Sequence, residues 1–238
     1  MKEERYFYVP NADRNNELPP EETTHALRVL RLQSGDDMFL MDGRGNFYHA
    51  EVSLATHKKC LYHIKETLPQ QKTWRGHIHL AIAPTKHIDR MEWLAEKATE
   101  VGFDEITFLH CAFSERKALR TDRIEKIVIS AAKQSRKPWI PMVNELESFK
   151  TFIQQPREGR KFIAHCYEEI EKKDFFDNLM NGPNERITVL VGPEGDFSID
   201  EVKFAMAQGY ESVSLGRSRL RTETAGLIAV TMAQISLR

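Results

Sequence analysis

Alternating apolar and polar residues mark the first part of the chain as a series of short strands. The pattern predicts strands over residues 5–9, 37–42, 47–54 and 60–66, with a Gly-Arg-Gly-Asn turn at 43–46. Apolar positions three and four apart predict one short helix over 21–31, with Ala26, Val29 and Leu30 on one face. One helix among several strands indicates a compact β-barrel of about 70 residues.

Beyond residue 72, short apolar runs alternate with longer stretches of helical periodicity. Strands are predicted over 77–83, 105–110, 161–165, 187–191 and 213–215, and the first two helices over 89–101 and 123–135. The segment 68–72, with one proline and two glutamines, is predicted to be a linker. This alternation is typical of an α/β fold, a parallel sheet with helices on both faces. We therefore expect two domains, residues 1–72 and 73–238.

A glycine-containing loop follows the apolar strand at 187–191. It reads GPEGD over 192–196 and is followed by Ser198 and Glu201, whose spacing of three predicts a capping box that opens a helix. By itself a Gly-Pro-Glu-Gly segment is a good β-turn, with proline able to take the first central position and glycine a left-handed one. The loop is predicted to be fixed at both ends.

A second such loop follows the strand at 213–215. It starts at Gly216, carries three interleaved arginines, and ends at Thr222, the predicted N-cap of a final apolar helix. Thr-Glu-Thr at a helix start is also explained by capping alone. Two such loops one helix apart are expected to leave neighbouring strands, which is where open α/β sheets hold ligands. Clustered guanidiniums suit phosphate or an electron-rich heterocycle.

The two loops also carry a resemblance to a known family. GPEGDFSIDE followed by LGRSRLRTETA resembles the C-terminal signature of the bacterial 16S ribosomal RNA uridine-N3 methyltransferases, the RsmE family of the SPOUT superfamily. The likeness extends upstream through Lys86, Trp93, Lys97, Ala98, Thr99, Glu100, Gly102 and Gln134-Ser135-Arg136. The family commonly has Gly-Gly after Glu194, whereas the second position here is Asp196, which puts the fine shape of the loop in question.

The resemblance implies both the architecture and the cofactor. Residues 1–72 would form a PUA-like RNA-binding domain, and residues 73–238 a SPOUT methyltransferase domain whose C-terminal segment is threaded into a trefoil knot. The cofactor would be S-adenosylmethionine, the substrate 16S ribosomal RNA in the 30S subunit, and the assembly a homodimer. Cofactor-binding positions carried over from the family are Leu190, Gly192, Pro193, Glu194, Gly195, Leu215, Gly216, Leu220, Thr222, Thr224 and Ala225.

Methylation at uridine N3 requires loss of the N3 proton, and the resulting anion spreads onto the flanking carbonyl oxygens. A fixed positive donor that meets this charge lowers the barrier, which is the role we assign to Arg221, with Arg219 or Arg217 clamping phosphate or base. Glu223 is the nearest carboxylate able to accept the proton. A glutamate in a first helical turn is explained equally well by the helix dipole.

RNA contacts are expected on both predicted domains. Family counterparts of Arg5, His25, Arg28 and Arg31 face RNA, although residues 1–72 hold ten Lys or Arg against eleven Asp or Glu, and a lone histidine is more often structural. Residues 113–137 hold eight Lys or Arg and three Asp or Glu. This run is either a solvated face or an RNA-facing surface in which Gln134 and Arg136 contribute.

Composition narrows the classes of protein to which the chain can belong. Hydrophobic content of 41% and charged content of 29% are typical of a soluble protein, and the net charge of −1 requires any nucleic-acid contact to be a local patch. The chain has no apolar run long enough to cross a membrane and no signal peptide, so we expect a cytoplasmic protein without membrane contact. Three widely separated cysteines, Cys60, Cys111 and Cys166, predict buried free thiols.

Missing motifs constrain the chemistry further. The sequence has no G-x-G-x-x-G after its early strand, no P-loop, no H-E-x-x-H, no C-x-x-C and no G-x-S-x-G, so we expect no metal site and no dinucleotide, nucleotide-hydrolase or serine-hydrolase chemistry. Three alternatives stay open: a ribose 2′-hydroxyl SPOUT methyltransferase, a non-catalytic RNA-binding protein, and a small-molecule α/β enzyme.

Overall fold

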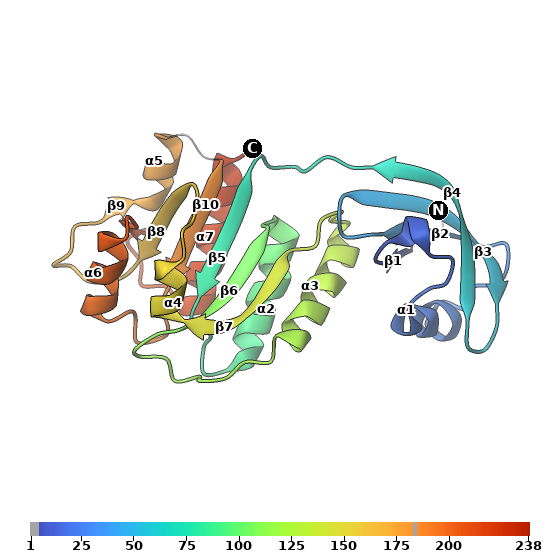
Figure 1. The fold of residues 1–238 in the computed structure, drawn as a ribbon, viewed down its shortest axis with the longest axis horizontal. Coiled ribbons are helices and arrows are strands. Elements are labelled where there is room, and N and C mark those ends of the chain that lie inside the picture. The colour runs from blue at the N-terminus through green and yellow to red at the C-terminus, as the bar shows by residue number, and fades with distance from the viewer. Residues whose placement is uncertain (1–4, 183–184) are drawn as a thin grey trace. The chain divides into compact units, whose positions relative to one another are not determined.

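The fold divides into two compact units, seen in a computed structural model that describes residues 5–182 and 185–238 (Figure 1). The first unit comprises the chain up to Lys72 together with Ile129–Ile140. The second comprises Thr73–Val128 and Pro141–Arg238. Helix α3 (Thr121–Ser135) therefore contributes its first half to one unit and its second half to the other, which the predicted boundary at residue 72 did not foresee.

A four-stranded sheet forms the first unit. Its strands are β1 (Tyr6–Tyr8), β2 (Asp37–Met41), β3 (Asn46–Ala55) and β4 (Cys60–Pro69), in the order β1-β2-β3-β4. β1 runs parallel to β2, and the other pairs are antiparallel. Among the described residues β1 and β4 are the sheet edges, so the expected barrel is not closed by hydrogen bonds between them. β4 also extends through Pro69 by pairing with β3, which shortens the predicted linker.

The predicted helix over 21–31 is replaced by two shorter helical segments. The first is an α-helix, α1 (Pro20–Thr24), which continues into the second, a π-helical segment over His25–Val29. A separate 3₁₀ turn spans Ala12–Arg14. The wider π-helical turn changes the register, so Val29 is 67% exposed instead of lying on the buried face with Ala26. The chain leaves this segment through Arg31, whose φ of 55° is left-handed.

The segment 129–140 completes the first unit. Ala132 is buried with Met41 and Phe47 in a small apolar cluster. The ammonium of Lys133 lies 2.7 Å from the carboxylate of Glu22, and both side chains are largely buried. Paired burial of these charges and of apolar surface explains why this part of α3 belongs to the first unit.

The second unit contains a seven-stranded sheet in the order β7-β6-β5-β10-β8-β11-β9, and every pair in it is parallel. Its strands are β5 (His77–Ile82), β6 (Glu105–His110), β7 (Met142–Ser148), β8 (Arg160–Ala164), β9 (Lys173–Asp174), β10 (Arg186–Val191) and β11 (Glu211–Ser214). Five of these were predicted within a few residues, and β7 and β9 were not.

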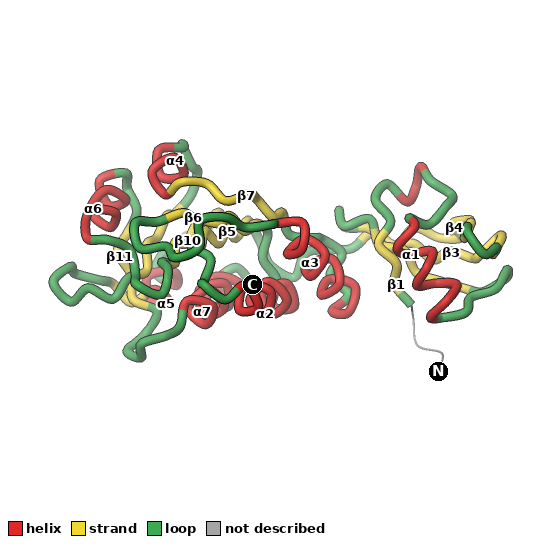
Figure 2. The backbone as a smooth tube through the Cα atoms, turned by 90° about the horizontal axis from the view of Figure 1, so that it is seen from below, coloured by secondary structure: helices red, strands yellow, loops and turns green. Residues whose placement is uncertain are grey.

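Helices cover both faces of this sheet, as predicted. α2 (Ile88–Val101), α5 (Phe175–Met180) and α7 (Thr222–Ser236) lie on one face, and α4 (Phe149–Gln154) and α6 (Ile199–Ala207) lie on the other (Figure 2). α7 packs closely on α2 and β5 because Gly226 has no side chain. A Cβ added at Gly226 would lie only 2.9 Å from Ile82 and 3.0 Å from Leu94. None of the described helices is long and apolar enough to span a membrane.

One predicted relationship is wrong and affects the site. Strands β10 and β11, which precede the two glycine-containing loops, are not neighbours, because β8 lies between them and pairs with both. The carboxyl end of β8 is therefore inserted between the two predicted loops. A third loop, the one that follows β8, must contribute to any site at this edge of the sheet.

Candidate active site

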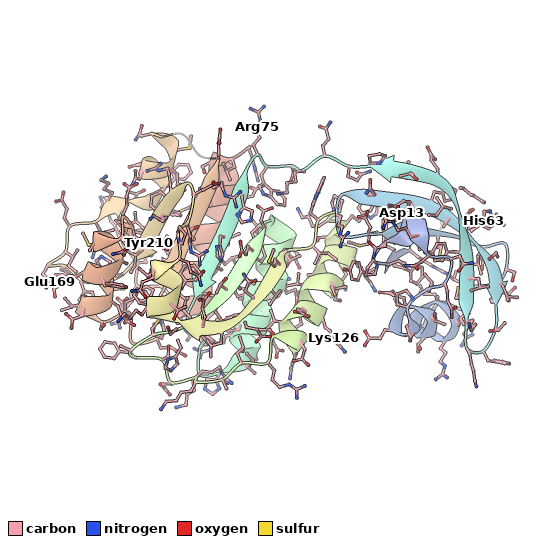
Figure 3. The ribbon with its side chains drawn as sticks, viewed as in Figure 1. Asp13, His63, Arg75, Lys126, Glu169 and Tyr210 are labelled. Carbon is pink, nitrogen blue, oxygen red and sulfur yellow. The ribbon has the colours of Figure 1, made fainter. Side chains whose placement is uncertain are left out.

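A cavity of about 1050 Å³ opens at the carboxyl ends of β8, β10 and β11. Its walls are residues 164–169 after β8, 191–196 after β10 and 214–222 after β11, with Lys172, Arg90 and Ala225 added from neighbouring segments. Glu169 marks the outer end of the loop after β8 in Figure 3. This is the edge at which parallel α/β sheets bind ligands.

The loop after β10 has a defined turn. The amide of Asp196 donates to the carbonyl of Pro193 at 2.9 Å, so proline opens the turn and does not occupy its first central position. The left-handed residue is Asp196, with φ of 67°, and not a glycine. Its carboxylate accepts from the amides of Cys166 and Phe197, each at 2.7 Å, which stabilises a conformation that Asp tolerates better than most residues.

The predicted capping box is confirmed beyond this turn. The hydroxyl of Ser198 accepts from the amide of Glu201 at 3.2 Å, and the carboxylate of Glu201 accepts from the amide of Ser198 at 2.8 Å. The second oxygen of Glu201 accepts from the amide of Ala112 at 2.8 Å, which ties α6 to the loop after β6.

Glu194 joins the cavity wall to the loop after β5. Its Oε1 accepts from the amide of Lys86 at 3.0 Å, while Arg116 Nε donates to the carbonyl of Thr85 at 3.0 Å. The ammonium of Lys86 lies 2.9 Å from the carboxylate of Glu115. These contacts therefore connect the loops after three strands, β5, β6 and β10, around the GPEG turn.

The loop after β11 presents its arginines to the cavity. Gly216 has φ of 116°, and the hydroxyl of Ser214 donates to its carbonyl at 2.8 Å. Arg217, Arg219 and Arg221 are exposed and line the cavity. This side of the cavity is therefore strongly cationic.

The start of α7 differs by one residue from the prediction. Arg221, in an extended conformation, is the N-cap residue, and Thr222 is the first helical residue and is buried. The carbonyl of Arg221 accepts from the amide of Ala225 at 2.8 Å. The backbone of Arg221 is thus fixed at the start of the helix.

Glu223 lies in the first turn of α7 and is only 7% exposed. Its Oε1 is 3.9 Å from Arg90 Nε, and its Oε2 is buried without a hydrogen-bond partner among the described residues. A dipole interaction alone does not explain a buried carboxylate oxygen that accepts no hydrogen bond from the part of the chain that the structure describes.

Most of the predicted cofactor positions come together in the cavity. Those that line it are Gly192, Pro193, Glu194, Gly195, Leu215, Gly216, Leu220, Thr222 and Ala225. Leu190 is instead fully buried in the core below the loops, and Thr224 lines a second cavity next to the first.

Sequence reasoning missed the loop after β8. His165 is buried, and its Nε2 lies 2.9 Å from the hydroxyl of Ser212; burial is the main cause that lowers the pKa of its imidazole. Cys166 is exposed in the cavity wall, contrary to the expected buried thiol, whereas Cys60 and Cys111 are buried as predicted. The carboxyl end of the predicted strand 161–165 was the available signal.

The predicted RNA-binding residues outside the cavity all lie in the first unit. Arg5 donates to the carbonyl of Leu30 at 3.3 Å, and the ring of His25 lies 6.0 Å from that of Phe7. The others are exposed: Arg28, Arg31, Gln134 and Arg136. Arg136 stacks at 5.3 Å over the ring of Tyr6, so Gln134 and Arg136 belong with the N-terminal residues and not with the predicted methyltransferase domain.

Fold and site together define an RNA methyltransferase with a PUA-like module. Residues 72–234 match the RNA methyltransferase domain family, and residues 18–64 match the RNA methyltransferase PUA domain family. The chain belongs to the ribosomal RNA small subunit methyltransferase E family, which confirms the resemblance inferred from the two loops.

Individual relatives cover nearly the whole chain. A ribosomal RNA small subunit methyltransferase E of Synechocystis is 30% identical over 215 residues, which is 88% of this chain and 68% of that protein. The crystal structure of a probable rRNA-methyltransferase from Porphyromonas gingivalis is 40% identical, with a TM-score of 0.89 over 98% of this chain and 100% of that one. A ribosomal RNA small subunit methyltransferase E from Neisseria gonorrhoeae, bound to S-adenosyl methionine, is 26% identical, with a TM-score of 0.82 over 98% of each chain.

Proposed function

We propose that this protein transfers a methyl group from S-adenosylmethionine to N3 of a specific uridine in 16S ribosomal RNA of the small subunit. The observation that carries the proposal is the cavity at the ends of β8, β10 and β11, where glycine-containing loops meet three arginines. Membership of the methyltransferase E family, with a relative crystallised in complex with S-adenosyl methionine, supports the choice of cofactor.

The cavity suits S-adenosylmethionine in size and in charge. Its volume of about 1050 Å³ is at the upper end of small-molecule sites. A Cβ added at Gly216 would meet no atom of the described residues within 4 Å, which leaves room for a ligand beside the backbone. Exposed Glu168 and Glu169 suit a sulfonium and an ammonium, and the arginines suit a carboxylate. Gly192, Gly216, Leu220 and Ala225 would hold the adenosyl part.

When bound, S-adenosylmethionine supplies an electrophilic methyl group. The chain's own residues must hold the base in line and stabilise the anion left on the ring when the N3 proton departs. Arg221, the N-cap residue of α7, would supply that stabilisation, and Arg219 and Arg217 on the same loop would hold phosphate or base. Glu223, with its unpartnered Oε2, would accept the proton.

Three further properties belong to the same proposal. The C-terminal segment that includes β11 and α7 would be threaded through a trefoil knot, the protein would be a homodimer, and its location would be cytoplasmic, where ribosomal subunits are assembled. Insertion of β8 between β10 and β11 is the feature that supports a non-local path for this segment. The first unit, residues 1–72 with 129–140, would bind RNA through Arg5, His25, Arg28, Arg31, Gln134 and Arg136.

The test is transfer of a labelled methyl group to purified 30S subunits, naked 16S ribosomal RNA and transfer RNA, followed by nucleoside analysis. We expect 3-methyluridine in the 16S RNA and no labelled transfer RNA. A label at a ribose 2′-oxygen would favour a different methyltransferase class, and no transfer despite cofactor binding would contradict the proposed substrate.

A further inference from the structure

A second cavity of about 740 Å³ lies next to the cofactor cavity on the same unit. It is lined by Asp89, Arg90, Trp93, Arg219, Leu220, Arg221, Glu223 and Thr224. Arg90, Arg219, Leu220 and Arg221 line both cavities, so the two share a wall. A group bound in the second cavity would lie beside a ligand in the first.

Trp93 gives this cavity an aromatic wall. It lies on α2, and its residue surface is 43% exposed although most apolar side chains of that helix are buried. Unstacked bases in single-stranded RNA bind proteins chiefly by stacking on such exposed aromatic rings. An indole in a concave, partly charged wall is suited to a flat base.

The charged residues around Trp93 favour RNA over a second protein chain. Three guanidiniums face two carboxylates, Asp89 and Glu223, which leaves the lining with a net positive charge. The cores of protein–protein interfaces are depleted of charged residues, whereas phosphates flanking a base need arginines. Five charged residues among eight therefore fit a nucleotide better than a partner helix.

A polar group that needs a ligand also lines this cavity. Glu223 is only 7% exposed, and its Oε2 has no hydrogen-bond partner within residues 5–182 and 185–238. Buried carboxylate oxygens are ordinarily satisfied, so an acceptor without a donor points to a ligand that carries one. In uridine N1 is bonded to the ribose, so the base has a single ring N–H donor, at N3, flanked by two carbonyl acceptors that guanidiniums can bind.

We propose that the second cavity is the pocket for the extruded uracil base, stacked on Trp93, with its N3–H directed to Glu223 and its carbonyl oxygens towards Arg90 and Arg221. The inference rests on the proposed methyl transfer, and it adds the site at which the base is held. Trp93 is a substrate-binding residue that positions the base, and the shared wall lets N3 approach the methyl donor across a short path.

The test compares Trp93→Ala and Trp93→Phe with the wild-type enzyme, using 30S subunits and labelled cofactor. We expect kcat/KM for RNA to fall about tenfold to a hundredfold in Trp93→Ala and to recover largely in Trp93→Phe. Affinity for S-adenosylmethionine by calorimetry should stay unchanged in both. Met206→Ala, an exposed apolar side chain on the other face of the sheet, is the matched control.

Fluorescence gives a second readout that a structural role would not produce. A uridine-containing oligonucleotide should quench tryptophan emission in the wild-type enzyme and much less in Trp93→Phe. Unchanged kcat/KM in Trp93→Ala, or loss of the dimer on sedimentation in place of a loss of RNA turnover, would overturn the inference. If the wild-type enzyme methylates a position other than N3, the proposed function fails, while the quenching still decides whether a base binds at Trp93.

Discussion

The carboxylate of Asp196 holds the backbone amide of Cys166 at 2.7 Å, which joins the loop after β10 to the loop after β8. Its other oxygen accepts from the amide of Phe197 at 2.7 Å. Both loops form walls of the cavity that we propose for the cofactor. Asp196 is thus a left-handed residue whose side chain bridges the loops that follow two strands.

Replacement of Asp196 separates its two roles. Asp196→Gly keeps the left-handed backbone and removes both hydrogen bonds, so affinity for S-adenosylmethionine should fall several-fold through greater freedom of the two loops. Asp196→Asn, which tolerates this conformation and keeps one acceptor, should recover part of the affinity. Calorimetry measures the affinity, and amide exchange at Cys166 should accelerate in the Gly variant. Wild-type affinity in Asp196→Gly would show that the bridge has no role in cofactor binding.

The position of Gly192 leaves no room for a side chain. An added Cβ would lie 2.9 Å from the amide nitrogen of Phe197, so Gly192→Ala forces the GPEG loop to shift. We expect cofactor affinity to drop at least tenfold and the melting temperature to fall by a few degrees, because a contact of this kind typically costs about 1–3 kcal/mol. Gly209→Ala, outside the cavity, is a control for cofactor affinity alone, because the φ of 82° at Gly209 makes an alanine there destabilising as well. Unchanged affinity in Gly192→Ala would contradict the assigned loop.

Arg221 is predicted to act on turnover. Arg221→Lys keeps the charge and loses the planar fork, so kcat should fall on the order of a hundredfold, about 3 kcal/mol, while affinities for cofactor and RNA change little. Turnover of the wild-type enzyme should rise with pH until the N3 proton is lost, and the variant should reach its plateau at higher pH. An increase confined to the KM for RNA would make Arg221 a binding residue.

Arg28 on the first unit is exposed and is predicted to contact phosphate. Arg28→Ala should weaken binding of 16S RNA at low salt and lower the slope of log K against log salt by about 1, because one fewer counterion is released. Lys58→Ala, exposed at the turn between β3 and β4, serves as the control. Equal salt slopes in wild-type and Arg28→Ala proteins would exclude a phosphate contact there.

The buried imidazole of His79 is expected to make the second unit less stable in acid. Burial lowers the pKa of its imidazole from 6.5 to about 3, with the charges of Arg157, His77 and Arg186 acting in the same direction. The unfolded chain therefore binds more protons between pH 6.5 and 3, and the free energy of unfolding falls as pH drops through this window, by up to about 5 kcal/mol. His79→Gln, which can keep the 2.8 Å contact with the Thr107 hydroxyl, should flatten the dependence in denaturant titrations. The same acid loss in the Gln variant would assign it to other groups.

Sequence patterns predicted those elements of the second unit that depend only on neighbouring residues. The strand at 105–110 and the capping box at Ser198 appear as predicted, because a buried apolar run and a cap depend only on nearby residues. β7 was missed because none of its seven residues is buried, so it has no apolar alternation. The very short β9 and α5 depend on packing for their existence.

In the candidate site, too, features set by nearby residues were predicted and features set by sheet pairing were not. The GPEG and arginine loops could be found from motifs, but the loop after β8 could not, because pairing of β8 with both β10 and β11 is a long-range property of the sheet. The exposed Val29 has a related cause. A π-helical turn at His25–Val29 rotates the face that a regular helix would bury.

The first unit is assembled from two separate stretches of sequence, which determines when it can fold during synthesis. A chain emerging from the ribosome presents β1 to β4 first, but Met41 and Phe47 must wait for Ala132 and Ile140 before their cluster can close. By then β5, α2 and β6 have also emerged. The first unit therefore completes its fold only after part of the second unit has been synthesised. A nascent chain halted after Lys72 would expose apolar surface to which chaperones can bind.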